Sequence, residues 1–320
     1  MISLSYNIKN KKRLLQIDKL SKFYGGYTAL DNISFKVPKG SVFGLLGPNG
    51  AGKTSLIRIL NQIILPDKGT VFLDGEQLNP SHISQIGYLP EERGLYKSMK
   101  VGEQAMYLAQ LKGMSKAKAK ERLNFWFDKF EISDWWDKKI QELSKGMAQK
   151  VQFIVTVLHE PKLLIFDEPF SGFDPVNAEL IAKEILELKN QGATIIFSTH
   201  RMETVEAMCD DIVLLDNSKK ILEGKLEELQ NRYKSNIFEV GIKTTKENLL
   251  KQKLCENYKI QPANFQTLYD DFKFQLSLKA GTSSEGILEI LSNYGEVTHF
   301  LEQIPTMNSI FMKAVSNKNA

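Results

Sequence analysis

The chain has 320 residues, which is long enough for one large domain with an appendage or for two domains. Of these residues, 42% are hydrophobic and 25% are charged, which is typical of a globular protein. The net charge of +4 is too small to favour nucleic acid or an acidic membrane surface as a partner. Cys209 and Cys255 form no disulfide framework, and no apolar stretch reaches the roughly 18 residues of a membrane span, so any membrane connection is expected to run through a partner.

The first part of the predicted fold is rich in strands. Apolar segments predict antiparallel strands and one buried strand at 14–20, 32–37, 41–47 and 70–75. A further short apolar run ends at Tyr88 and leads into LPEERGLY, residues 89–96. The charged residues of that segment are Glu91, Glu92 and Arg93, and a solvated loop is the default interpretation unless a functional site lies nearby.

The middle of the chain, at about 95–160, predicts a helical subdomain. Apolar residues recur at three- and four-residue spacing within 101–113, 118–130 and 144–158. The apolar runs at 163–167 and 193–198 then flank an amphipathic helix at 176–190, as parallel strands of one βαβ unit would. The chemistry of such a unit is expected at the carboxyl ends of its strands.

The last part of the chain, from about 235 to 320, predicts a small α+β domain. Residues 237–243 and 272–278 alternate apolar and polar side chains as half-exposed strands do, and 284–295 is helix-like. This region has no phosphate-binding pattern, so we expect it to regulate or stabilise the protein without binding nucleotide.

A glycine-rich motif follows the predicted strand at 41–47. It matches G-x-x-x-x-G-K-[ST] and leads into a helix-like segment that begins at Ser55; its residues are Gly47, Pro48, Asn49, Gly50, Ala51, Gly52, Lys53 and Thr54. Backbone N–H groups of such a loop surround a phosphate at a helix N-terminus. We expect Lys53 to reach the β- and γ-phosphates and Thr54 to ligate Mg²⁺. A chance glycine-rich turn is disfavoured by the flanking strand and helix.

Two acidic residues and a histidine end the predicted parallel strands. Asp167 closes the strand at 163–167 and could hold Mg²⁺, while Glu168 could orient an attacking water. A helix-capping acid pair is the alternative. His200 follows the neighbouring strand, where it could touch the γ-phosphate, although a lone histidine is more often a packed or surface residue.

With the segment Leu143–Lys150, these motifs resemble the ATP-binding cassette (ABC) family of ATPases over roughly residues 15–225. The resemblance implies an α/β P-loop NTPase fold with a parallel sheet core, an N-terminal antiparallel β subdomain and a helical subdomain, here followed by the α+β domain. The family signature is LSGGQ, which binds the γ-phosphate of ATP held by the other subunit. Ser144 and Gly146 keep this pattern, while Lys145 and Met147 depart from it. Ser144 is also a good helix N-cap.

The resemblance assigns further residues by position. Tyr24 is expected to stack on adenine, with Tyr27 as the less favoured candidate. The segment Ser171–Asp174 matches the D-loop, with Asp174 at the expected dimer interface, and His200 matches the switch histidine. Glu91 stands where the family has a glutamine near Mg²⁺ and the attacking water, so it could still approach the metal. Glu92 and Arg93 are assigned to the solvated or partner-facing side.

The resemblance implies an ATP-hydrolysing subunit that uses ATP and Mg²⁺. The family works as a head-to-tail dimer, either of two copies or with a related subunit, on the cytoplasmic face of the cell membrane and bound to a separate integral membrane permease. The PTMNSIFMKAV ending, 305–315, resembles the extension of bacterial exporters of the sodium and drug type. The alternative function is a soluble ABC ATPase acting on ribosomes or DNA. No nucleic-acid partner is expected.

Overall fold

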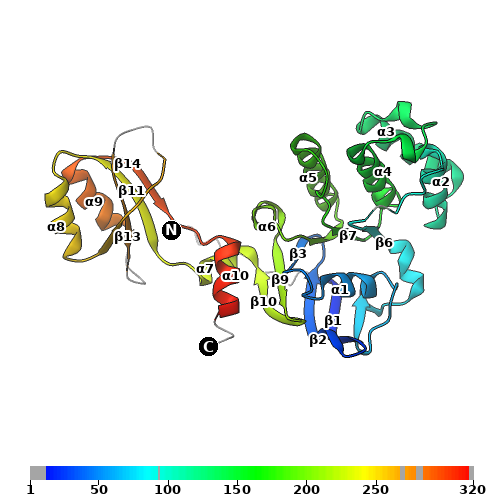
Figure 1. Ribbon diagram of the computed structural model, residues 1–320, viewed down its shortest axis with the longest axis horizontal. Helices are drawn as coiled ribbons and strands as arrows, with labels where there is room; N and C mark the ends of the chain where they lie inside the picture. Colours follow the sequence, from blue (N-terminus) through cyan, green and yellow to red (C-terminus); the bar gives the residue numbers. More distant parts are fainter. Residues whose placement is uncertain (1–11, 93, 267–270, 279–283, 317–320) are drawn as a thin grey trace, which may run out of the picture. The chain divides into compact units, whose positions relative to one another are not determined.

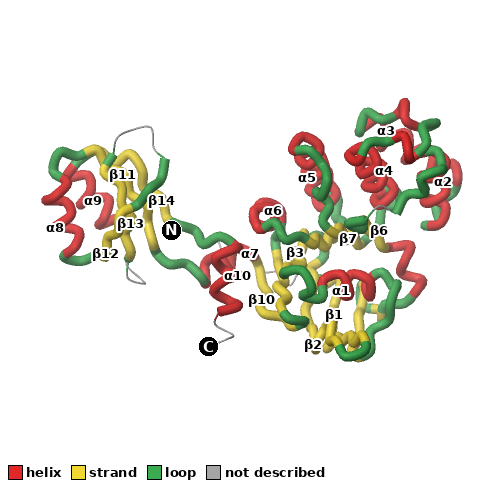
Figure 2. Tube along the Cα trace, in the orientation of Figure 1, coloured by secondary structure: helices red, strands yellow, loops and turns green. Residues whose placement is uncertain are grey.

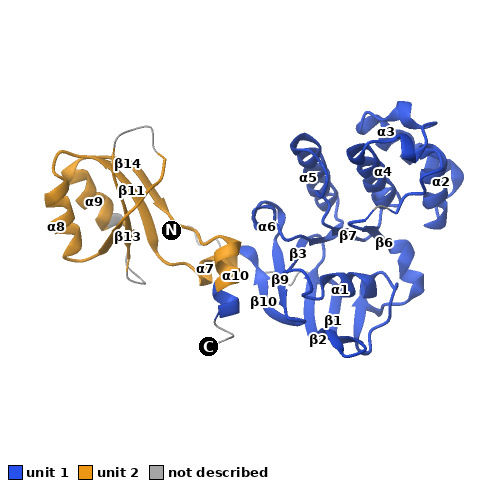
Figure 3. Ribbon diagram, viewed as in Figure 1, with its two compact units in different colours: residues 1–226, 313–320 blue, residues 227–312 orange. Residues whose placement is uncertain are grey.

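The computed structural model describes residues 12–92, 94–266, 271–278 and 284–316 (Figure 1). The chain divides into two compact units, one of residues 1–226 and 313–320 and the other of residues 227–312 (Figure 3). The predicted division between 225 and 235 differs chiefly in assigning residues 313–320 to the second domain.

A mixed sheet forms the centre of the first unit. Its order is β10-β9-β3-β8-β7-β6, and only the β9–β10 pair is antiparallel. Every residue of β3, β7 and β8 is buried, which explains their short, largely apolar sequences; the polar residues of β7 and β8 stand at the strand ends. The adjacent parallel strands predicted at 163–167 and 193–198 are confirmed. The strands are β3 (Val42–Leu46), β6 (Ile86–Leu89), β7 (Leu163–Asp167), β8 (Thr194–Ser198), β9 (Asp211–Asp216) and β10 (Lys219–Lys225).

An antiparallel sheet of order β2-β1-β4-β5 packs with the central sheet. Residues of both sheets and of α1 form one hydrophobic core, which includes Ile17, Phe35, Phe43, Ile57 and Ile196. The predicted N-terminal β subdomain is therefore present. Its elements are β1 (Arg13–Tyr24), β2 (Tyr27–Pro38), α1 (Lys53–Leu60), β4 (Lys68–Leu73) and β5 (Glu76–Gln77).

The helical subdomain consists of α2, α3 and α4, which lie together in Figure 2. Trp136 packs there, with its ring centroid 5.6 Å from that of Phe127 and with Gly102 directly against its indole. The bounds are η1 (Pro80–Gln85), α2 (Val101–Leu111), α3 (Lys116–Lys129), η2 (Ser133–Trp135), η3 (Ile140–Glu142) and α4 (Lys145–Val157); α5 (Pro175–Asn190) and α6 (Met202–Met208) follow β7 and β8.

The second unit has a βαββαβ order and an antiparallel sheet of order β12-β13-β11-β14, the ferredoxin-like arrangement. Helices α8 and α9 cover one face of the sheet (Figures 1 and 2) and share a separate core with it. The predicted α+β class is confirmed. Its elements are β11 (Ile237–Lys243), α8 (Glu247–Cys255), β12 (Lys259–Pro262), β13 (Phe272–Ser277), α9 (Glu285–Tyr294) and β14 (Glu296–Glu302). The unit boundaries at 226/227 and 312/313 fall within α7 (Leu226–Arg232) and α10 (Met307–Ser316).

Candidate functional site

The glycine-rich loop joins the central strand β3 to the N-terminus of α1. Gly47, Gly50 and Gly52 have φ values of 147°, 81° and 104°, which L-residues rarely adopt. A Cβ on Gly47 would lie 2.3 Å from the Leu215 carbonyl oxygen, and one on Gly52 would lie 2.3 Å from the Ala29 carbonyl oxygen. The backbone of β9 thus lies directly against Gly47 and that of β2 against Gly52, so only glycine fits at these two positions.

Lys53, the first residue of α1, folds back over this loop. Its Nζ donates to the carbonyl oxygens of Gly47 at 2.6 Å and Pro48 at 3.0 Å. Burial lowers the pKa of Lys53, and the negative charges of Glu168, Asp167 and Glu91 oppose that shift. The lysine ammonium and these three carboxylates therefore share one electrostatic environment.

Asp167 ends β7 as a buried residue. Burial raises the pKa of its carboxyl group, the Ser198 side chain lowers it, and the nearby charges of Glu91 and Glu168 raise it further. Burial also raises the pKa of Tyr88 to about 12, and the charges of Asp167 and Glu91 contribute to that rise. The structure thus brings Glu91 into the same cluster as Asp167, although Glu91 lies more than 70 residues earlier in the chain.

Glu168 and His200 meet because β7 and β8 are neighbours. The His200 ring Nδ1 lies 2.6 Å from Glu168 Oε1, and the His200 backbone N–H donates to the same oxygen at 2.9 Å. The Thr199 hydroxyl donates to the other carboxylate oxygen at 3.2 Å. Glu168 itself has a φ of 49°, a left-handed conformation that is uncommon for this residue type. Its carboxylate is therefore held in one orientation by contacts to both of its oxygens.

The signature segment lies at the start of α4. The Ser144 hydroxyl accepts from the Met147 backbone N–H at 3.3 Å, so the expected N-cap role is present. The Lys145 side chain lies over Gly172, where an added Cβ would collide with its Cε, and the Gln149 side-chain amide donates to the Ser171 carbonyl. The start of α4 thus rests on the D-loop.

Asp174 ends the D-loop and caps α5. Its Oδ1 accepts from the Asn177 backbone N–H at 3.0 Å, and its Oδ2 accepts from the Asn177 side-chain amide at 2.6 Å. The backbone hydrogen bond lowers the pKa of Asp174. Within the described residues no hydrogen bond joins Ser144, Gly146 or Asp174 to the phosphate loop of the same chain.

The loop that carries Glu91 is attached to α4. The Gln152 side-chain amide donates weakly to the carbonyls of Pro90 and Glu92, at 3.5 and 3.4 Å. The Thr156 hydroxyl donates to the Tyr88 carbonyl at 3.3 Å. Glu91 and Glu92 are both exposed, whereas Arg93 lies outside the described residues.

Tyr24 and Tyr27 face one another across the β1–β2 hairpin. Tyr24 is 43% exposed, and the Lys22 ammonium lies 5.5 Å from its ring centroid. Tyr27 is 54% exposed and donates its hydroxyl hydrogen to the Gly50 carbonyl at 2.9 Å. Sequence reasoning missed this contact, because nothing in the local pattern reports which hairpin residue reaches the loop.

The oxygen atoms of the site fit a magnesium ion shared with a nucleotide. Among the described residues, no group of three or more His, Cys, Asp or Glu side chains could hold a metal by itself. Mg²⁺ in phosphoryl-transfer sites takes one or two protein oxygens and completes its shell with phosphate and water. Thr54, exposed on the first turn of α1, and Asp167, in a cluster of like charges, supply such oxygens.

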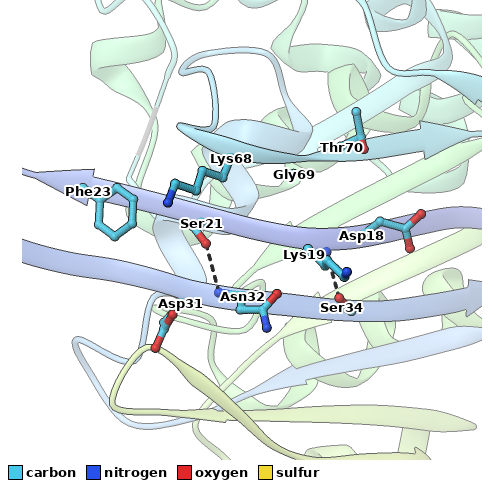
Figure 4. A pocket seen from close by; sticks show the side chains of 10 residues that line it. All are labelled: Asp18, Lys19, Ser21, Phe23, Asp31, Asn32, Ser34, Lys68, Gly69 and Thr70. Atoms are coloured by element: carbon cyan, nitrogen blue, oxygen red, sulfur yellow. Dashed lines mark hydrogen bonds between the residues drawn. The ribbon is translucent and has the colours of Figure 1, made fainter.

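A cavity of about 750 Å³ lies elsewhere, over strands β1, β2 and β4 (Figure 4). The Ser34 hydroxyl there accepts from the Lys19 backbone N–H at 2.8 Å, and the Ser21 hydroxyl accepts from the Asn32 backbone N–H at 3.0 Å. These hydroxyls complete the pairing of two irregular strands, and none of the predicted site residues lines the cavity.

Comparison with known proteins covers both units. Residues 30–171 match the family model described as ABC transporter, and residues 224–315 match the model described as ATP-binding protein DrrA1-3-like, C-terminal domain. The chain is 40% identical over 309 residues to the ABC transporter ATP-binding protein YhaQ of Bacillus subtilis, covering 94% of this chain and 98% of that one. It is 34% identical over 220 residues to the Nod factor export ATP-binding protein I of Ralstonia nicotianae, covering 68% of each.

A solved structure of the ATP binding subunit of an ABC transporter superposes with a TM-score of 0.64 at 32% identity, covering 69% of this chain and 93% of that one. None of the helices in the part of the chain that the structure describes has the length and apolar character needed to cross a membrane.

Proposed function

Because this chain belongs to the ABC transporter ATP-binding proteins, we propose that it hydrolyses Mg²⁺-bound ATP as part of a head-to-tail dimer and thereby drives an export permease in the cell membrane. The ABC ATPase fold and the ATP-binding domain are shared with the whole family. We propose four things for this chain: the residue roles, the dimer, the permease and the direction of transport.

The proposed roles follow the contacts at the carboxyl ends of the strands. Lys53 and the loop amides bind the β- and γ-phosphates. Thr54 and Asp167 hold Mg²⁺, which would neutralise phosphate charge when bound. Glu168 accepts a proton from the attacking water, while His200 orients Glu168 and faces the γ-phosphate. Tyr24 stacks on adenine.

One observation carries the proposal of a dimer. The proposed base, its histidine and the phosphate lysine are assembled within one chain, whereas at the start of α4 the Lys145 and Gln149 side chains contact the D-loop, and among the described residues no hydrogen bond joins Ser144 or Gly146 to the phosphate loop. A head-to-tail partner would bring a second copy of that helix start to this nucleotide. Helix N-termini favour anions, so the arrangement suits a γ-phosphate.

Export through a permease has separate support. The Ralstonia nicotianae relative is named for Nod factor export and covers 68% of this chain. Transport would place the protein on the cytoplasmic face of the membrane. The alternative, an ATPase acting on ribosomes or DNA, is disfavoured by the mild charge of +4 and by a single phosphate-loop motif per chain.

The test is to isolate the tagged chain from detergent-solubilised native membranes and to identify what binds to it. The Glu168→Gln variant with ATP should retain its partner in the closed state, and wild type without ATP is the control. We expect an integral membrane protein in stoichiometric amount. Recovery of ribosomal particles or DNA, with no membrane protein, would support the alternative function.

A further inference from the structure

Tyr27 begins β2 beside the phosphate loop, and its role is not explained by adenine stacking. Its phenolic hydroxyl donates to the Gly50 carbonyl at 2.9 Å, while its ring stays 54% exposed. Tyr24, its partner across the hairpin, has no comparable hydrogen bond among the described residues. The two tyrosines therefore lie side by side on one hairpin but make different contacts.

The start of β2 braces the second half of the phosphate loop at two points. Tyr27 holds the Gly50 carbonyl, and two residues later the Ala29 carbonyl lies so close to Gly52 that no Cβ could be added there. Between them, the Thr28 carbonyl accepts from the Ser218 hydroxyl at 2.5 Å, in the turn between β9 and β10. This end of β2 is thus held on one side by the β9–β10 turn and contacts the loop on the other.

The hydrogen bond at Gly50 controls the orientation of one peptide group. In a planar trans peptide the carbonyl of one residue and the N–H of the next point in opposite directions. Tyr27 holds the Gly50 carbonyl on the hairpin side, so the Ala51 N–H points the other way, where it donates to the Pro48 carbonyl at 3.2 Å. Gly50 has a φ of 81° and no Cβ, so nothing in its own side chain resists rotation of this peptide.

A phosphate loop binds its anion with N–H groups that point inward. If the peptide between Gly50 and Ala51 turned over, the Gly50 carbonyl would face the Pro48 carbonyl and the Ala51 N–H would lose its acceptor, so the turn within the loop would open. We propose that Tyr27 is a positioning residue: by holding the Gly50 carbonyl it preserves the turn that the Ala51 N–H closes onto the Pro48 carbonyl, keeps the N–H groups of the loop in place for an anion, and links the hairpin that carries Tyr24 to the phosphate loop. It acts on the phosphates and not on the base.

The test compares Tyr27→Phe with Tyr107→Phe, which also removes one hydroxyl from an exposed tyrosine. Binding of ATP and of inorganic triphosphate is measured by competition against a fluorescent nucleotide. Loss of one hydrogen bond should weaken both ligands by the same factor in Tyr27→Phe, about two- to ten-fold. Tyr107→Phe should leave both affinities unchanged, because Tyr107 lies in α2 of the helical subdomain, is 45% exposed and has no role in the proposed nucleotide site.

Two outcomes would overturn the proposal. Unchanged affinity of Tyr27→Phe for inorganic triphosphate would mean that the hydroxyl does not position the loop. A Tyr27→Ala variant that loses affinity for ATP but keeps that for inorganic triphosphate would make Tyr27 a base-stacking residue. Thermal denaturation separates these results from a general loss of fold, because a purely structural role would lower the melting temperature without a triphosphate-specific change.

Discussion

The phosphate-binding end of the first unit and its helical subdomain are held in place by different kinds of contact. The phosphate loop follows β3, which is hydrogen-bonded through its backbone to β8 on one side and β9 on the other. Backbone carbonyls of Leu215 and Ala29 lie directly against its glycines. Its position is therefore determined by the sheet.

The helical subdomain is attached largely by side chains. Gln152 and Thr156 of α4 bind carbonyls around the Glu91 loop, and the Lys112 ammonium at the end of α2 donates to the Ile83 and Ile86 carbonyls, each at 2.8 Å. Lys129 of α3 contacts Glu184 and Glu187 of α5 at 2.6 and 2.7 Å. Such contacts can exchange without loss of a strand ladder. The comparison indicates that backbone pairing holds the phosphate-binding part of this unit in place, whereas side-chain contacts hold the part that carries the signature helix.

The largest expected effect is on the rate of ATP hydrolysis, in the phosphate-binding part of the first unit. Glu168→Gln removes the proposed proton acceptor but keeps the shape of the side chain, so turnover should fall by about 100-fold or more while ATP affinity stays within a few-fold of wild type. Steady-state ATPase assays and ATP titrations check this, and ATP should then accumulate a closed dimer visible by size-exclusion chromatography. Normal turnover would remove Glu168 from the role of base.

The protein should lose stability when the buried ion pair between α3 of the helical subdomain and α5 is removed. Lys129→Met leaves Glu184, whose side chain is only 3% exposed, without its cation. An uncompensated buried charge costs about 3 kcal/mol, so the midpoint of chemical denaturation should fall clearly. The matched control is Glu187→Gln, which removes the more exposed carboxylate and should have a much smaller effect. Equal effects of the two variants would contradict the stabilising role of the buried ion pair.

The ion pair between Lys129 and Glu187 should make stability depend on pH. The hydrogen bond from Lys129 lowers the pKa of Glu187. A lowered carboxyl pKa contributes stability that is present above the ordinary glutamate value and is lost as the pH falls through the lowered value. The difference in stability between wild type and Glu187→Gln should therefore shrink on acidification.

A smaller effect is expected at Glu91, whose loop is attached to α4 of the helical subdomain. An ionised carboxylate near the triphosphate is repelled unless Mg²⁺ lies between them, so Glu91→Gln should weaken the dependence of hydrolysis on Mg²⁺ concentration and reduce the ratio of rates at high and low Mg²⁺ by about two- to five-fold. ATP binding should persist. The control is the exposed neighbour variant Glu92→Gln, which should behave as wild type in the same Mg²⁺ titration. Identical curves for Glu91→Gln and wild type would make this segment a docking loop only.

The smallest effect is expected from removing the second unit. That unit has its own core and carries none of the proposed nucleotide-binding residues. A chain that ends at Lys225 should keep the ATP affinity of the full chain, although newly exposed apolar surface should reduce its solubility. Complete loss of ATP binding by a folded truncated chain would show that the second unit takes part in the site.

Sequence patterns predicted most of the local structure and one pair of neighbours in the central sheet, the strands at 163–167 and 193–198. The strands at 163–167 and 237–243 have the predicted bounds, because their apolar or alternating patterns are local signals. The β9–β10 hairpin and the short strands β12 and β14 were not predicted. Residues of β12 and β14 are mostly half-buried or exposed, so their sequences alternate weakly.

Contacts between distant segments could not be predicted from the sequence, for a different reason. Lys145 lying on Gly172 and Tyr27 reaching Gly50 both depend on how separate elements pack, which no local pattern reports. The proximity of Glu91 to Asp167 was predicted only through the family resemblance, and the β6–β7 pairing now gives it a physical basis.

The central claim is that each ATP site is built from the phosphate loop of one chain and the signature helix of another. The most direct measurement mixes two inactive variants, Lys53→Ala and Ser144→Arg, and assays ATP hydrolysis. In a mixed dimer, one of the two sites pairs an intact Lys53 with an intact Ser144. Random pairing of equal amounts should therefore restore roughly a quarter of the wild-type sites. If mixed dimers are isolated with differently tagged chains and still hydrolyse no ATP, the composite site is wrong.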